Sequence, residues 1–68
     1  MGNIQSERQQ RARAAVIQLL RRKRYCRWRD LKNIAKAHGV KAYWASKKLR
    51  RIGVIRRVRG KRGLYELT

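Results

Sequence analysis

Acidic residues are scarce in this chain. It carries only Glu7, Asp30 and Glu66 against 21 Lys and Arg, and its formal net charge at pH 7 is +18. The three acids lie far apart in the sequence, which disfavours the paired carboxylates of general acid–base catalysis. Self-repulsion at this charge destabilises an isolated fold, so the excess suits a chain whose usual partner is a polyanion.

Cysteine and histidine are also scarce, with one of each. The lone Cys26 excludes an internal disulfide, agrees with a reducing compartment and suits a small buried apolar position. One thiol and His38 do not have the spacing of a metal site. No glycine-rich phosphate loop precedes a helix. We therefore expect no enzyme activity, no metal and no cofactor.

Long apolar segments are missing as well. No run approaches the roughly 18 residues that would span a bilayer, and the N-terminus lacks the apolar centre of a signal peptide. We therefore expect a cytoplasmic protein without a membrane partner. Apolar residues still make up 43% of the 68 residues, which is enough for one core. We expect a single domain over residues 1–68, with residues 1–5 flexible.

Residues 41–52 carry the clearest helical pattern. Their apolar side follows the spacing i, i+3, i+7, i+10 and consists of Ala42, Ala45, Leu49 and Ile52. The opposite side holds cations and an indole without any acid: Trp44, Lys47, Lys48 and Arg51. Gly53 follows at once, which is typical of a helix that ends in a left-handed residue. A solvated face usually mixes both signs of charge, so this one indicates contact with a polyanion.

The preceding part of the chain predicts two more helices. The first runs from about residue 7 to residue 22 or 23, after a capping-box pattern with Ser6 as N-cap. The second occupies residues 30–38. Between them, the aromatic-rich residues 25–27 suit a short strand. We expect Tyr25 and Trp28 to lie in the core or at its edge, and His38 to be a residue of a helix end.

The C-terminal part predicts a β-hairpin. Two β-favouring runs, residues 54–59 and 64–68, flank the loop 60–63, which has glycine at each end. Its packed face can be supplied by Val58, Leu64, Tyr65 and Leu67. Its cations are Arg56, Arg57, Arg59, Lys61 and Arg62.

This order of elements resembles the winged helix-turn-helix family. The resemblance covers nearly the whole chain and is carried by Asp30-Leu31 with Ile34-Ala35, the turn Gly39-Val40, the segment Ile52-Gly53-Val54-Ile55, and residues 60–63 with Leu64-Tyr65-Glu66-Leu67. It implies an α+β fold, mainly α, with three helices, a C-terminal β-hairpin wing and a possible short strand at residues 25–27. In this family the third helix enters the major groove, and the wing lies along the backbone or in the minor groove.

The resemblance implies two sets of contact residues. The third helix would present Lys41, Tyr43, Trp44, Lys47, Lys48 and Arg51 to the groove. The wing would present Arg56, Arg57, Arg59, Lys61 and Arg62. Two readings stay open for the aromatics, because Tyr43 and Trp44 can stack on nucleic acid or pack against the protein.

Two functions stay open as well. We favour duplex DNA binding by a small transcription regulator or chromatin-like protein, associated with the nucleoid. Its contacts would be mainly to the backbone, since the third helix has no Asn or Gln on its outer face. The alternative is a ribosomal or other ribonucleoprotein component that binds structured RNA. It is favoured by nine Lys and Arg between Arg8 and Arg29, far in sequence from residues 41–52. The sequence leaves the oligomeric state open.

Overall fold

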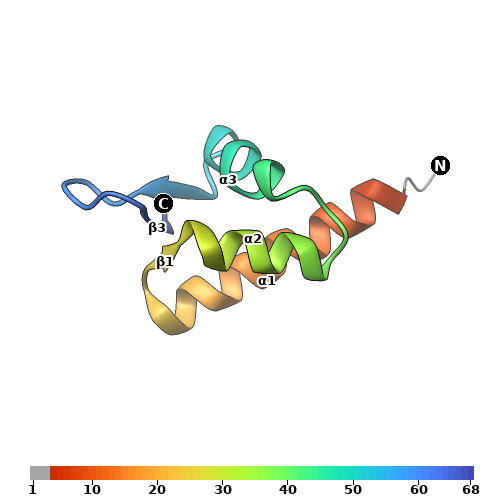
Figure 1. Ribbon diagram of the computed structural model, residues 1–68, viewed down its shortest axis with the longest axis horizontal. Helices are drawn as coiled ribbons and strands as arrows, with labels where there is room; N and C mark the ends of the chain where they lie inside the picture. The colour runs from red at the N-terminus through yellow and green to blue at the C-terminus, as the bar shows by residue number, and fades with distance from the viewer. Residues whose placement is uncertain (1–3) are drawn as a thin grey trace.

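The computed structural model describes residues 4–68; residues 1–3, part of the segment expected to be flexible, lie outside the described residues. Within residues 4–68 the chain is a small α+β protein, mainly helical, with three helices and a three-stranded antiparallel sheet (Figure 1). The elements are α1 (Ile4–Lys23), β1 (Cys26–Arg27), α2 (Trp28–Ala37), α3 (Ala42–Arg51), β2 (Ile55–Arg57) and β3 (Leu64–Leu67). This arrangement is compatible with the winged-helix resemblance.

Helix α1 begins earlier than its sequence pattern predicts. It starts at Ile4, so residues 4 and 5 are helical and the prediction of Ser6 as N-cap is wrong. Its inward stripe has a spacing of four residues and consists of Ala12, Val16 and Leu20, each at most 3% exposed. This apolar stripe faces the core and leaves the cations of α1 on the outside.

Helix α2 also begins earlier, at Trp28, with Arg27 as its N-cap. The Asp30 carboxylate explains this start, because its Oδ2 accepts the Arg27 backbone N–H at 3.0 Å. This is one half of a capping box. In the other half of a capping box the N-cap side chain accepts the backbone N–H three residues further on. The Arg27 guanidinium cannot do so, because it has no hydrogen-bond acceptor.

The two aromatics beside β1 are exposed, and the prediction that they lie in the core or at its edge is wrong. Tyr25 is 40% and Trp28 41% exposed, whereas Cys26 between them is 2% exposed. Side chains alternate across a strand, so the inward position taken by Cys26 turns Tyr25 outward. Trp28 is the first residue of α2, and its exposure follows from the helix start and not from strand alternation. The predicted short strand and the predicted burial of Cys26 are confirmed.

Glycines end α2 and α3 in the same way. Gly39 and Gly53 have φ values of 71° and 81°, in the left-handed region that favours glycine. The valine after each glycine donates a backbone hydrogen bond to the end of the helix. Val40 N–H donates to the Ala35 carbonyl and Val54 N–H to the Leu49 carbonyl, each with an N–O distance of 2.9 Å. These are Schellman motifs. The left-handed C-cap predicted at Gly53 is confirmed, and His38 is a helix-end residue as predicted.

The predicted hairpin is formed by β2 and β3, and β3 is the central strand of the sheet, in the order β1-β3-β2. Tyr65 of β3 lies opposite Cys26 on one side and Arg57 on the other. Tyr65 is 7% exposed and joins the core, so the inner face of the sheet closes over the helices.

The core lies between the three helices and this sheet face: Val16, Leu20, Cys26, Leu31, Ala35, Ala45, Leu49, Ile55 and Tyr65. The predicted apolar face of α3 is correct at Ala45 and Leu49, which are fully buried. It is wrong at Ile52, which is 48% exposed. Ile52 follows the last helical residue and is the C-cap, at the edge of the buried stripe.

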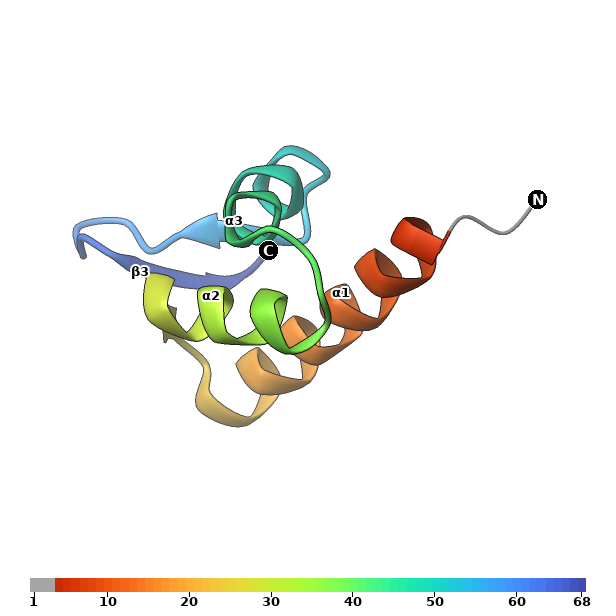
Figure 2. The same cartoon turned by 45° about the vertical axis from the view of Figure 1, so that its right-hand side comes forward.

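The molecule is elongated, with extents of 42 × 20 × 20 Å. The hairpin and the first turns of α1 project from opposite ends, and α3 lies on the opposite side of α2 from the turn that joins α1 to α2 (Figures 1 and 2). No helix in the described part of the chain has the length and apolarity to cross a membrane.

Candidate nucleic-acid interface

The outer side of α3 forms a basic surface. Burial of Ala45 and Leu49 fixes the rotation of the helix, so the cations three and four residues apart turn outward. A shallow hollow of about 340 Å³ is lined by Tyr43, Trp44, Lys47, Lys48 and Arg51, all from α3. Lys41 is exposed at the N-cap of the same helix. The structure therefore brings the predicted third-helix set together on one element.

Tyr43 is the most exposed aromatic of this surface, at 62%. Lys47 Nζ donates a hydrogen bond to its hydroxyl and lies 4.9 Å from the ring centroid. The ammonium lies beyond the hydroxyl end of the ring rather than above its face, so this is a hydrogen bond and not a cation–π contact. Lys47 therefore covers neither face of the Tyr43 ring.

Trp44 packs partly against the core, and its indole Nε1 is buried without a hydrogen-bond partner in the described residues. A small hollow of about 130 Å³ places the ring beside α1, with Gln9, Gln10, Arg13, Lys48 and Ile52 as the other lining residues. The packing role left open for Trp44 is thus present, while its position in the α3 hollow keeps it beside the basic surface.

Sequence reasoning missed the α1 residues at this point. Gln9, Gln10 and Arg13 lie beside Trp44 and Lys48 only because α1 packs against α3. No local pattern reports such a long-range contact. Gln9 and Gln10 matter because glutamine amides can hydrogen-bond adenine edges, and the outer face of α3 has no amide side chain.

Ser46 and Arg50 serve the helix itself. Ser46 is buried at 9% exposure, and its hydroxyl donates to the Tyr43 carbonyl at 3.3 Å. Arg50 Nε donates to the Ser46 carbonyl at 3.1 Å. Ser46 is therefore a small residue at a helix packing position.

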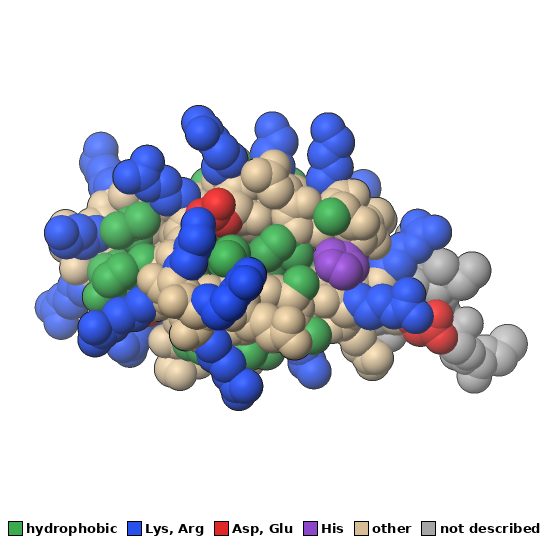
Figure 3. All heavy atoms as spheres, turned by 90° about the horizontal axis from the view of Figure 1, so that it is seen from below, with side chains coloured by type: hydrophobic (Ala, Val, Ile, Leu, Met, Phe, Trp, Pro, Cys, Tyr) green, Lys and Arg blue, Asp and Glu red, His purple; other side chains and the backbone are tan. Residues whose placement is uncertain are grey.

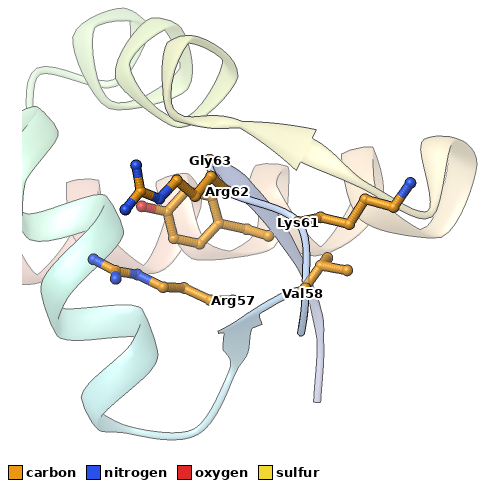
Figure 4. A pocket seen from close by; sticks show the side chains of 7 residues that line it. Arg57, Val58, Lys61, Arg62 and Gly63 are labelled. Carbon is orange, nitrogen blue, oxygen red and sulfur yellow. The ribbon is translucent and has the colours of Figure 1, made fainter.

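The hairpin supplies a second basic hollow. It has a volume of about 560 Å³ and is lined by Arg57, Val58, Gly60, Lys61, Arg62, Gly63 and Tyr65. Arg57 and Arg62 extend toward the side on which α3 lies, whereas Lys61 extends the other way (Figure 4). Two of the predicted wing cations thus extend from the hairpin toward α3.

Arg56 and Arg59 lie apart from this hollow. Arg56 pairs with Glu66 across the strands at 3.0 Å, and strand alternation puts it on the opposite sheet face from Arg57. The Arg56 side chain is 65% exposed, so this ion pair contributes little to stability. Its effect on the surface is to offset one cation. Arg59 is exposed in the turn after β2.

Basic residues surround the rest of the molecule too. All 21 Lys and Arg lie in the described part of the chain, and each is exposed except Arg50. Eleven of them belong to α1, β1, α2 and the links between these elements. Viewed from the side away from α3, Lys and Arg side chains project along much of the upper, left and lower outline (Figure 3). The positive charge is not confined to one face.

Cys26 does not add chemistry to these surfaces. Burial raises the pKa of its thiol from 9.0 to about 11, with a further rise from Asp30 and an opposing effect of Lys23. The thiol is therefore neutral near pH 7 and a weak nucleophile. Among residues 4–68, no group of three or more His, Cys, Asp and Glu side chains could hold a metal ion.

No protein-family model matches this chain, and neither a curated protein nor a solved structure matches it. What the protein does is therefore inferred from its own residues and geometry.

Proposed function

We propose that this chain is a winged-helix nucleic-acid-binding protein that holds duplex DNA on the face formed by α3 and the β2–β3 hairpin. One observation carries the proposal: the two hollows of this face are lined by six cations and no acid. These cations are Lys47, Lys48, Arg51, Arg57, Lys61 and Arg62.

Phosphate binding supplies most of the affinity in this account. Each phosphate neutralised by a lysine or arginine releases condensed counterions. If six phosphates are engaged, affinity falls roughly 10³-fold between 50 and 200 mM salt. Helix α3 has ten residues and a length of about 15 Å. In this account its exposed basic side enters the major groove. Arg57 and Arg62 then meet the flanking backbone.

Sequence preference is modest in this account. Lys48 and Arg51 can reach guanine edges or phosphates, but α3 offers no amide on its outer face. Gln9 and Gln10 of α1 lie beside Lys48 and supply amides next to this surface. Backbone contacts therefore dominate, which fits a chromatin-like protein as well as a small transcription regulator.

Structured RNA is the second candidate, and a specific observation favours it. Eleven exposed cations lie outside α3 and the hairpin, and Lys and Arg side chains are spread over the face of the molecule turned away from α3 (Figure 3). A protein embedded in folded RNA meets phosphates on several sides. Such a protein would associate with the ribosome or another ribonucleoprotein, whereas a duplex DNA binder would associate with the nucleoid.

Competition binding decides between these candidates. The full chain is bound to a labelled duplex DNA and challenged with unlabelled duplex, a folded RNA and ribosomal subunits, at about 150–200 mM salt so that weak charge contacts are suppressed. The proposal expects unlabelled duplex to compete best. Stronger competition by the RNA or the subunits would replace DNA with RNA as the ligand, and failure of all three to bind would reject a nucleic-acid function.

A further inference from the structure

The junction between α1 and α2, residues 21–29, exposes two large aromatics. Tyr25 and Trp28 are 40% and 41% exposed. A chain of 68 residues has few apolar side chains with which to build a core, so two half-exposed rings in one short segment are notable. The cations of the same segment are all exposed: Arg21, Arg22, Lys23, Arg24, Arg27 and Arg29.

The junction is held rigidly. Cys26 is buried and pairs with Tyr65, and Arg27 pairs with Leu64, so the segment is bound to the centre of the sheet. Tyr25 and Trp28 are three positions apart in the sequence, so their Cα atoms lie no more than about 11 Å apart. The two exposed side chains are therefore carried by neighbouring points of one fixed segment of backbone.

Arg24 occupies an unusual backbone position. Its φ is 70°, in the left-handed region that α2 and α3 leave to glycine after their last turns. An arginine is strained there, and glycine would avoid this cost. The guanidinium lies 5.9 Å from the ring centroid of Tyr25. The strained residue thus keeps a cation beside an exposed ring.

The composition of this junction fits an unpaired strand of nucleic acid. Residues 21–29 contain no acid. The adjacent acid, Asp30, accepts a hydrogen bond from the Arg27 backbone N–H. Proteins that bind single strands combine cations for the phosphates with aromatic rings on which unpaired bases stack. A duplex keeps its bases stacked on one another and does not offer them to Tyr25 or Trp28.

We propose that the α1–α2 junction is a second nucleic-acid site, which binds an unpaired strand of RNA or DNA through Tyr25, Trp28 and the surrounding arginines. The turn between α1 and α2 lies on the other side of the molecule from α3 (Figures 1 and 2). One molecule can therefore hold a duplex and an unpaired strand together. The junction site does not depend on the duplex proposal, because the two ligands are measured separately.

Alanine variants test the site in the full chain. Labelled oligo(dT) and oligo(U), each 12 nucleotides long as an assay choice, and a labelled DNA duplex are titrated at about 150 mM salt. Tyr25→Ala and Trp28→Ala should each lower affinity for the unpaired strands about 10-fold and leave duplex affinity unchanged. The matched control is Tyr43→Ala, an exposed tyrosine on α3, which should not change unpaired-strand affinity. The two oligomers distinguish DNA from RNA.

An unchanged affinity for both oligomers, or an equal loss for oligomers and duplex, would overturn the proposal. A second measurement leaves the site itself intact. In Trp44→Phe, Trp28 is the remaining tryptophan, and the indole N–H that is lost makes no hydrogen bond in the described residues. Stacking should quench the Trp28 emission when an oligomer binds. Binding without quenching would contradict stacking on Trp28.

Discussion

At the scale of single residues, burial separates the side chains that hold this fold from those available to a ligand. Cys26 and Leu49 are at most 2% exposed, and both face the core. Tyr43, Lys48 and Arg62 are exposed, and none of the three contacts an acid in the described residues. The sequence predicted the burial of Cys26 and Leu49 and the outward position of Lys48 correctly, and the role of Lys48 as a nucleic-acid contact stays a prediction.

The burial of two aromatic residues was predicted wrongly, because it depends on contacts that their local sequence does not show. A large ring in a small domain is ordinarily a core residue, which led to the prediction for Tyr25 and Trp28. Their exposure follows from the strand alternation at Cys26 and from the start of α2 at Trp28. The inward position of Cys26 depends on the pairing of β1 with β3, which brings residue 26 beside residue 65. The start of α2 depends on the cap that Asp30 provides.

The buried thiol predicts a pH effect on stability. The pKa of Cys26 is raised from 9.0 to about 11, chiefly by burial. Above pH 9 the unfolded thiol loses its proton while the folded one keeps it, so unfolding becomes more favourable. The contribution of the neutral, buried thiol to stability is complete below pH 9 and is lost as pH rises through 11. Urea unfolding at pH 8, 10 and 11 should show it.

Cys26→Ala is the control for this effect. Lysine and tyrosine titrate in both proteins, so the difference between the two unfolding free energies isolates the thiol. Wild type should lose stability relative to Cys26→Ala across this range. Parallel pH profiles would show that the Cys26 pKa is the same in the folded and unfolded chains.

At the scale of elements, helix ends were predicted where a local signal defines them. Gly53 ends α3 as its sequence position indicates, because a left-handed residue is a backbone property. The starts of α1 and α2 were predicted two or three residues late. At α2 the deciding contact is Asp30, whose carboxylate caps a helix with an arginine at the N-cap instead of the usual serine or threonine.

The cap at Asp30 predicts a measurable loss of stability. Asp30→Ala removes the acceptor of the Arg27 N–H and a favourable charge at the helix N-terminus. The expected cost is about 1 kcal/mol of unfolding free energy, measured by urea unfolding at pH 7. Asp30→Asn keeps an oxygen acceptor, so it should lose less than Asp30→Ala. An equal loss in both variants would mean that charge alone, and not the hydrogen bond, matters at this position.

At the scale of the whole molecule, charge was predictable in amount and not in position. Counting residues gives +18, but only folding shows that cations lie on α1 and α2 as well as on α3 and the hairpin. The candidate face on α3 followed from helical periodicity. The division of the hairpin cations did not, since it depends on strand register and on the Arg56–Glu66 pair.

A protein that is basic on every side has two consequences. It binds polyanions without orientation when salt is low, because exposed charges act over about 10 Å at 0.1 M. A specific face therefore has to be tested through the number of phosphates that named residues engage. The slope of log affinity against log salt concentration reports that number.

The most direct test of the central claim is this slope for duplex DNA in wild type, Lys48→Ala and Arg62→Ala. Each alanine variant should reduce the slope by about one unit, whereas Lys48→Arg should keep it. Lys32→Ala is the matched control, an exposed cation on α2 outside the proposed face, and should leave the slope unchanged. Unchanged slopes for Lys48→Ala and Arg62→Ala, or an equal reduction for Lys32→Ala, would contradict the assignment of α3 and the hairpin as the duplex-binding face.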